Sequence, residues 1–329
     1  MKNYGDYGGK ISIIGMGNVG QAVAMNFYEK RIGRQIYGFG RPGGKTERIN
    51  ARIDEIIDSH QQLGPELITG KYPEELEDSE IVVITAGNPR KPSQKREDLA
   101  KENNDIVGKW SGYIKEYAPH SKVIVATNPA GVMTNVALDE TGFPRERVMG
   151  EQGIDARRMI REISRYLGLT GSRMSGYVLG NHGDDMVIPL ECFTIGGTTL
   201  EKYLDGIGKV DELKNLEEIA QKMKRASQPL IEGLGQSPWL GPGEYVSRLA
   251  EEIYFGPECC DRGTTDSALI KLKGEYGING VAAVPIVLGR EGIIKIIELP
   301  SLTNEHREEL HEAAEHIKEI TDSLYSGGE

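Results

Sequence analysis

The stretch that decides the fold is Ile11-Ser12-Ile13-Ile14-Gly15-Met16-Gly17-Asn18-Val19-Gly20, near the start of a 329-residue chain. The apolar run Lys10–Ile14 predicts a strand, and the residues after the glycines predict a helix to about Lys30. A G-x-G-x-x-G turn between a strand and a helix is typical of dinucleotide binding, because the glycines allow a tight turn and close backbone approach to a pyrophosphate. A glycine-rich turn without a ligand is the simpler alternative, but it does not explain the flanking elements. The predicted cofactor loop comprises Gly15, Met16, Gly17, Asn18, Val19 and Gly20.

Short apolar runs and helical stretches alternate along the rest of the first half. Strands are predicted at Gln35–Phe39, Ile81–Thr85 and Lys122–Thr127, with helices around Thr46–Ser59 and Asp98–Tyr117. This alternation favours a parallel sheet with right-handed crossovers, in which ligands bind beyond the carboxyl ends of the strands. The predicted fold class is α/β, with a Rossmann-type doubly wound parallel sheet.

The pattern changes after about Gly150, where glycine- and threonine-rich strands follow a helix near Asp155–Leu167. Further helices are predicted at Asp211–Gly233 and Tyr245–Tyr254, and strands at Met174–Leu179, Glu191–Ile195, Ala268–Lys273, Val281–Leu288 and Ile293–Glu298. A terminal helix would place one apolar face on the core, formed by Leu310, Ala313, Ala314, Ile317, Ile320 and Leu324. We therefore predict a dinucleotide-binding domain over residues 1–149 and a mixed α+β substrate and catalytic domain over residues 150–329.

The composition is that of an ordinary globular protein, with 38% hydrophobic and 27% charged residues. No apolar run approaches the roughly 20 residues that a membrane-spanning helix needs. A net charge of −11 argues against nucleic acid as the main partner, so anionic ligands would need local basic clusters. The start of the chain lacks the apolar core of a signal peptide, and the three cysteines form no C-x-x-C pair. We expect a cytoplasmic protein with no membrane and no nucleic-acid partner.

The end of the second predicted strand bears on the choice of cofactor. Sites for NAD usually place an acidic residue there, about 20 residues after the glycine loop, to receive the ribose hydroxyls. In this chain Gly40 and Arg41 occupy that place, and no acidic residue lies between Lys30 and Glu47. Arg41 is able to pair bidentately with a 2′-phosphate. We predict a preference for NADP over NAD; a permissive NAD site beside solvated charges is the alternative.

A basic segment, Gly87–Asp98, follows another predicted strand and carries four basic residues and two prolines. In isolation, an ordinary charged surface loop is the simpler interpretation. Its place at the carboxyl end of a strand favours a closing lid, which would bring positive charge to an anionic substrate and exclude water.

A candidate acid/base residue is His182, which lies among glycine and asparagine at the end of a predicted strand. A free imidazole titrates near about pH 6.5, so it exchanges a proton readily close to neutrality. It needs a partner to fix its tautomer: Asp155 is one candidate, and Asp184 and Asp185 are competitors. A structural histidine held in a turn is the alternative. None of the histidines has zinc-ligand spacing, so no metal site is predicted.

Several motifs occur together in the order found in one family, and on them the chain resembles the lactate/malate dehydrogenases over nearly its whole length. The matching segments are Ile11–Gly20, Thr85–Leu99, Thr127–Pro129, Asp155 with Arg158, Gly180–Asp184, Tyr276–Asn279 and Val284–Gly289. The resemblance implies reversible hydride transfer between a nicotinamide cofactor and a small 2-hydroxy acid, in a homodimer or homotetramer.

The resemblance also implies a role for each matching residue. His182 is similar to the family's proton donor and acceptor, and Asp155 to the carboxylate that orients it. Arg158 is similar to the arginine that clamps the substrate carboxylate through two parallel hydrogen bonds. The adjacent Arg157 is a possible competitor for that role, although the three-residue spacing from Asp155 favours Arg158.

Three further residues complete the implied substrate site. Arg96 is similar to the lid arginine that polarises the carbonyl, and Asn128 to the amide that binds substrate and orders the nicotinamide side. Arg90 occupies the position that separates the family's substrates, and an arginine there implies a second carboxylate, hence malate and oxaloacetate. A lactate dehydrogenase is the nearest alternative; an NAD-dependent glycosidase and a noncatalytic dinucleotide-binding protein are more remote.

Overall fold

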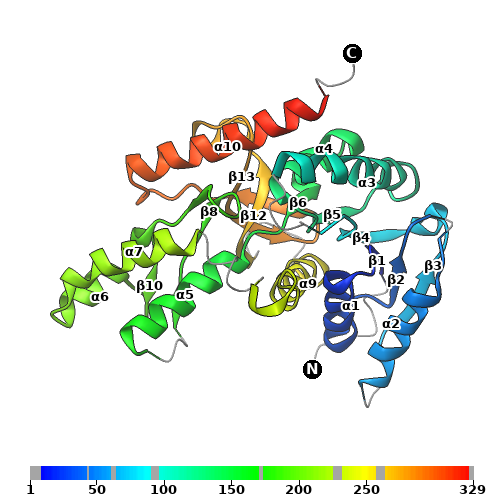
Figure 1. Cartoon of the computed structure of the whole chain (residues 1–329), viewed down its shortest axis with the longest axis horizontal. Coiled ribbons are helices and arrows are strands. Elements are labelled where there is room, and N and C mark those ends of the chain that lie inside the picture. The colour runs from blue at the N-terminus through cyan, green and yellow to red at the C-terminus, as the bar shows by residue number, and fades with distance from the viewer. Residues whose placement is uncertain are drawn as a thin grey trace.

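The structure, a computed structural model, describes residues 9–42, 44–60, 64–89, 96–169, 173–224, 232–256 and 264–325. Its main sheet begins with parallel strands in the order β3-β2-β1-β4-β5-β6 (Figure 1). These strands are β1 (Lys10–Ile14), β2 (Gln35–Phe39), β3 (Glu66–Gly70), β4 (Ser79–Ile84), β5 (Lys122–Val125) and β6 (Val148–Gly150). The strand order reverses between β1 and β4, as in doubly wound dinucleotide-binding sheets. The predicted α/β fold with a Rossmann-type parallel sheet is confirmed.

Helices cover both faces of the parallel strands (Figure 1). One face carries α1 (Asn18–Lys30) and α9 (Leu240–Phe255), which pack against each other, with α2 (Glu47–Asp58) beside α1 and β3. The other face carries α3 (Arg96–Tyr117) and α4 (Ala130–Thr141). Successive strand side chains point to opposite faces. For this reason Ile13 belongs to the core beneath α1 and α9, whereas Ile14 belongs to the core beneath α3 and α4.

The sheet continues from β6 into the second half of the chain. A single register pair, Leu269 with Gly150, joins the antiparallel strand β12 to β6, and Gly180 pairs with Ala283 to add β8. The added strands are β12 (Thr264–Lys271), β13 (Val281–Gly289), β14 (Gly292–Ile296), β8 (Leu179–Gly180) and β9 (Met186–Val187). The division into domains near residue 150 stays a prediction.

The remaining elements pack around this antiparallel extension. A small sheet of β7 (Met174–Ser175), β10 (Thr194–Ile195) and β11 (Thr198–Thr199) lies with α5 (Ile154–Leu167), α6 (Leu200–Gly206) and α7 (Leu213–Met223). The terminal helix α10 (Asn304–Tyr325) packs on α4 and β13 with the predicted apolar face, from Leu310 to Ile320, buried. Among the described residues, no helix is both long and apolar enough to cross a membrane.

Several elements were missed or misplaced by the sequence patterns. The helix α4 has no polar face to reveal its period, because nearly all of its residues are buried. The strand β6 has only three residues, and β3 is only partly buried. One predicted strand, Met174–Leu179, is wrong: β7 and β8 belong to different sheets. The chain changes sheet near Gly176, where a Cβ would lie 2.2 Å from Phe193.

Candidate active site

The glycines of the cofactor loop divide into two kinds. Gly15 has a φ of 100°, and a Cβ there would lie 2.5 Å from the backbone nitrogen of Ala86. A Cβ on Gly20 would lie 2.0 Å from the Gly15 carbonyl oxygen, so packing alone requires both glycines. A Cβ on Gly17, by contrast, would meet nothing within 4 Å. This open space at the N-terminus of α1 fits the pyrophosphate of a dinucleotide.

The cofactor loop is held by residues that the sequence patterns did not single out. Arg52 of α2 donates a hydrogen bond to the Met16 carbonyl oxygen, and its Nη2 lies 3.2 Å from Asn18 Oδ1. The Asn18 amide in turn donates to Gln236 Oε1 over 2.9 Å. Met16 is buried, and Val19 packs against the same core. No motif marks Arg52 or Gln236, because their proximity to the loop arises only on folding.

The end of β2 carries positive charge and no carboxylate. Gly40 follows the last residue of β2, and a Cβ on it would lie 2.8 Å from Ile49 Cδ1. The next residue, Arg41, is exposed and makes no ion pair with any described residue. The nearest acidic side chain in the sequence that follows, Glu47, is exposed on the first turn of α2. This end of the sheet therefore presents a guanidinium group where NAD sites usually carry a ribose-binding carboxylate.

A glycine turn at the end of β8 places His182. Gly180 has a φ of 81°, and a Cβ there would lie 2.5 Å from the Asp185 carbonyl oxygen. The turn closes through a 3.1 Å hydrogen bond from the Asn181 backbone to that same oxygen. The Asp185 carboxylate lies 3.0 Å from His316 Nδ1 on α10. Asp185, which competed with Asp155 in the sequence analysis, therefore contacts a different histidine.

Asp155 is the carboxylate that contacts His182. It lies in the first turn of α5, is 1% exposed, and its Oδ2 is 2.6 Å from His182 Nδ1. Its Oδ1 accepts a hydrogen bond of 2.9 Å from Arg158 Nη1. Because Nδ1 donates to Asp155, Nε2 of the imidazole is available as a proton acceptor and makes no hydrogen bond with any described residue. The histidine side chain is 34% exposed, so a substrate can reach it.

Electrostatics support an ionised Asp155 and a titratable His182. The Asp155 carboxylate raises the pKa of His182, and burial opposes this with a smaller effect. Burial by itself would raise the pKa of Asp155, but His182 and Arg158 together hold that pKa below its ordinary value. The pair is therefore suited to accept and return a proton near neutral pH, with Asp155 stabilising the imidazolium.

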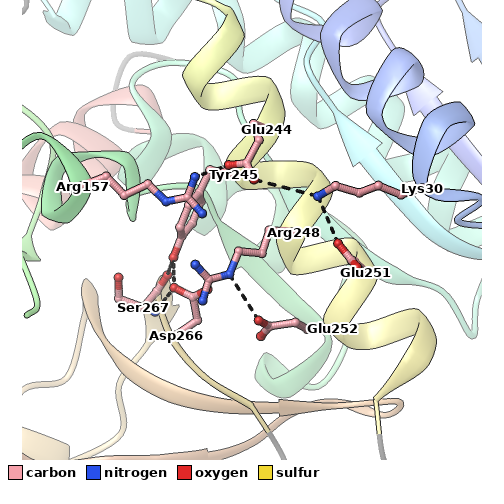
Figure 2. Close-up of polar contacts among 9 residues, drawn as sticks. All are labelled: Lys30, Arg157, Glu244, Tyr245, Arg248, Glu251, Glu252, Asp266 and Ser267. Atoms are coloured by element: carbon pink, nitrogen blue, oxygen red, sulfur yellow. Dashed lines mark hydrogen bonds and ion pairs between the residues drawn. The ribbon is translucent and has the colours of Figure 1, made fainter. Parts of the chain in front are cut away.

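The two adjacent arginines of α5 take different directions. Figure 2 shows Arg157 beside α9, where Nη1 forms an ion pair with Glu244 and the guanidinium lies 5.6 Å from the centre of the Tyr245 ring. Arg158 is the one that contacts Asp155, and its side chain is 11% exposed. Arg157 thus does not share the His182 cluster.

Two more polar residues reach this cluster from the segment between β6 and α5. Gln152 Nε2 lies 3.5 Å from Asp155 Oδ2. The Oε1 atom of Glu151 is buried and has no hydrogen-bond partner in the described part of the chain. Burial, followed by the charge of Asp155, raises the pKa of Glu151 to about 7. The strand β6 that places them was not among the predicted strands, so no sequence signal pointed to these two residues.

For the predicted substrate residues Arg90, Arg96 and Asn128, the structure describes fewer contacts. Arg90 lies outside the described residues, and Arg96 is the first residue of α3 with a side chain outside the description. Asn128 follows β5, is exposed, and its carbonyl oxygen accepts a hydrogen bond of 2.7 Å from Asn103 Nδ2. The roles of these residues stay predictions.

Comparison with known proteins agrees with this arrangement. The match to curated relatives extends over nearly the whole chain. A malate dehydrogenase from Bacillus israeli is 33% identical over 321 residues, which cover 96% of this chain and 98% of the relative. One from Pyrobaculum aerophilum is also 33% identical over 321 residues, covering 95% and 98%.

Solved structures with the same fold include both kinds of enzyme. The malate dehydrogenase of Salinibacter ruber superposes with a TM-score of 0.83 at 28% identity, covering 96% of this chain and 98% of its own. The minor L-lactate dehydrogenase of Enterococcus mundtii superposes with a TM-score of 0.86 at 25% identity, covering 97% and 99%. Residues 9–150 match the NAD binding domain profile of the lactate/malate dehydrogenases, and residues 153–326 match the profile of their alpha/beta C-terminal domain. The chain therefore belongs to the lactate/malate dehydrogenase family.

Proposed function

We propose that this protein is a malate dehydrogenase, which interconverts malate and oxaloacetate with a nicotinamide cofactor. The observation that carries the proposal is the 2.6 Å contact between His182 Nδ1 and Asp155, with Arg158 on the other oxygen of the same carboxylate. That arrangement puts a proton acceptor beside a group able to clamp a carboxylate. The relatives named as malate dehydrogenases support the choice of substrate.

Each residue contributes one part of the chemistry. The bound cofactor supplies the hydride acceptor for malate oxidation and the donor for the reverse reaction. His182 accepts the hydroxyl proton at Nε2, and Asp155 stabilises the imidazolium that results. Arg158 binds the carboxylate next to the reacting carbon through two parallel hydrogen bonds. In the reductive direction His182 returns its proton while Arg96 stabilises the developing alkoxide.

Arg90 selects a dicarboxylic substrate in this proposal. Burying its guanidinium over a methyl group would leave the charge unpaired, whereas a second carboxylate pairs it. We expect Arg90→Gln to lose about 2–5 kcal/mol of transition-state stabilisation with oxaloacetate. The measurement is kcat/KM for oxaloacetate and for pyruvate, with Lys91→Gln as the neighbouring control. Unchanged oxaloacetate kinetics in the Arg90 variant would refute the assignment, and a wild type that prefers pyruvate would favour a lactate dehydrogenase.

For the cofactor we propose NADP(H) in preference to NAD(H), because Arg41 is exposed at the end of β2 and no carboxylate replaces it there. NAD(H) is the second candidate, because residues 9–150 match the NAD binding domain of the lactate/malate dehydrogenases. We expect Arg41→Gln to lower kcat/KM for NADPH by about tenfold or more, the value of a charged hydrogen bond, and to change that for NADH little. A wild-type enzyme with a strong preference for NADH contradicts the proposal.

The domain division near residue 150, the cytoplasmic location and the homodimeric or homotetrameric state also stay proposals. The helices near residues 45–59 and 244–254 are our predicted subunit interfaces. Light scattering on the purified protein measures its mass in solution, and a monomer would contradict this prediction.

A further inference from the structure

Glu151 is a partly buried acid of the His182 cluster that the proposed mechanism does not use. It directly follows β6, and its backbone N–H donates to the Val125 carbonyl oxygen over 2.9 Å. The residue therefore sits at the carboxyl end of a parallel strand, where ligands of this fold bind. Its Oε1 atom is buried without a partner among the described residues. A buried carboxylate oxygen left without a donor is costly unless the group takes up a proton.

The two carboxylates of the cluster, Asp155 and Glu151, differ in the hydrogen bonds that they accept. Asp155 receives the hydrogen bonds of both His182 and Arg158. The Glu151 carboxylate receives no side-chain hydrogen bond from the described residues, and the backbone near Ile154 lowers its pKa less than His182 or Arg158 does. Two carboxylates that share a poorly solvated space do not both ionise easily, so the better-supplied one keeps the charge. Of the two, Glu151 therefore takes up a proton first and is protonated below about pH 7, while Asp155 stays ionised.

The charged groups that act on Glu151 come from two elements. Asp155 and Arg158 belong to α5, and His182 belongs to the turn after β8. Asp155 opposes ionisation of Glu151, whereas His182 and Arg158 favour it by smaller amounts. The arginine adjacent to Arg158, Arg157, is paired with Glu244 and does not balance this charge.

We infer that Glu151 is a positioning residue that must be protonated for tight binding of the substrate carboxylate at Arg158, so that its ionisation weakens substrate binding at alkaline pH. This inference rests on the proposed function, because it needs a substrate carboxylate on Arg158. Arg158 acts electrostatically on Glu151, so an ionised Glu151 would add a second negative charge to that of Asp155 in this cluster and repel the substrate carboxylate. A protonated Glu151 leaves the guanidinium charge to the substrate. Binding and protonation of Glu151 are thus linked.

The pH dependence of KM for malate separates Glu151 from His182. Malate requires a neutral His182, so deprotonation of the imidazole lowers KM as the pH rises. Ionisation of Glu151 acts in the opposite direction and raises KM. In the wild type we expect KM to pass through a minimum and then to rise by about tenfold towards pH 9, since a change of one pKa unit on binding corresponds to tenfold.

The test compares wild type with Glu151→Gln, which keeps the shape of the side chain and removes the ionisation. In this variant the alkaline rise in KM should disappear, with a smaller change in kcat than in KM. The fall in KM that accompanies deprotonation of His182 should move to lower pH, because the Glu151 charge helps to raise the pKa of His182. The matched control is Glu252→Gln on α9, a buried acid whose pKa burial also raises to about 7 but which lies in another cluster. Its KM profile should follow that of the wild type.

Three outcomes overturn the inference: a wild-type KM with no alkaline rise, a Glu151→Gln profile equal to that of the wild type, or a Glu252→Gln profile that changes in the same way. The first of these needs no variant, so it decides the matter even if Glu151→Gln does not fold. A failure of the proposed function looks different, because the wild type would then turn over neither malate nor oxaloacetate at any pH.

Discussion

Two buried clusters of this molecule share one electrostatic plan. In the first, Asp155 is held by His182 and by Arg158, with Glu151 nearby. In the second, drawn in Figure 2, Asp266 of β12 accepts a hydrogen bond from Tyr245 and pairs with Arg248 at 3.2 Å, with Glu252 nearby. Each neighbouring glutamate has a pKa raised to about 7, by burial first and by the aspartate second. An unusual pKa does not by itself distinguish a reactive cluster from a structural one.

The difference lies in the ring that contacts each aspartate. Burial and Asp266 raise the pKa of Tyr245 well above its ordinary value of 10.0, and its hydroxyl also lies 2.7 Å from the Ser267 carbonyl oxygen. The phenol is 1% exposed and does not titrate near neutrality. The imidazole of His182 has a pKa that Asp155 raises above its ordinary value, its side chain is 34% exposed, and Nε2 is available. The first cluster is therefore suited to proton transfer, and the second to holding α9 against β12.

The largest contrast is expected between the two rings themselves. His182→Gln should lower kcat for oxaloacetate reduction by about 10²–10⁴-fold, the usual contribution of general acid–base catalysis. Its melting temperature should remain near that of the wild type. Tyr245→Phe should do the reverse, losing about 1–3 kcal/mol of stability because Asp266 loses the phenol donor and keeps only the Ser267 backbone N–H and Arg248, while kcat changes little. Steady-state kinetics and thermal unfolding of both variants check this, and loss of activity in both alike would erase the contrast.

The two aspartates form the next pair. Asp155→Asn should reduce kcat by roughly 10²-fold or more, because His182 loses its orienting carboxylate. Asp155 raises the pKa of His182, so its neutralisation should lower that pKa. Malate oxidation needs a deprotonated His182, and the rise of kcat/KM with pH should then begin at lower pH. A profile in which kcat/KM begins to rise at higher pH contradicts this expectation. So does an equal shift of the profile in Asp266→Asn.

The adjacent arginines should differ by a smaller amount. Arg158→Gln removes the proposed carboxylate clamp and should raise KM for oxaloacetate by about 10–100-fold, the value of a charged hydrogen bond. The Arg157 side chain is 39% exposed in its pair with Glu244, so Arg157→Gln should cost at most about 1 kcal/mol of stability and leave KM nearly unchanged. Substrate titrations on both variants test this. Equal effects on KM would mean that Arg157 also binds substrate.

The smallest effect concerns stability and Glu252. Its folded pKa of about 7 is above its ordinary value of 4.5, mainly through burial. The stabilisation from its protonated form is present below pH 4.5 and is lost as the pH rises towards 7. Between these limits the wild type should lose more unfolding free energy than Glu252→Gln, by about 1 kcal/mol. Denaturant titrations at both ends of the range measure it, and parallel pH dependence in the two proteins would rule it out.

Much of the fold was readable because its signals are local. The strand Gln35–Phe39 was predicted with the bounds that β2 has, and the helix around Asp98–Tyr117 corresponds to α3. Such elements carry their own apolar period and their own turn residues. The helix α4 was missed because nine of its twelve residues are buried, which hides its period. The change of sheet near Gly176 was missed because the close approach of Phe193 to this glycine is not visible in short-range patterns.

By itself, the sequence determined the glycine loop, the α/β fold class, the family, and the choice of His182 with Asp155 as its first candidate partner. Those properties depend on residue types at short spacing. Only the tertiary structure decided that Asp185 contacts His316 instead, that Arg157 and Arg158 diverge, and that Glu151 joins the cluster. These outcomes depend on which elements pack together, and the free energy of burial and of charge pairing is defined only once the partners have met.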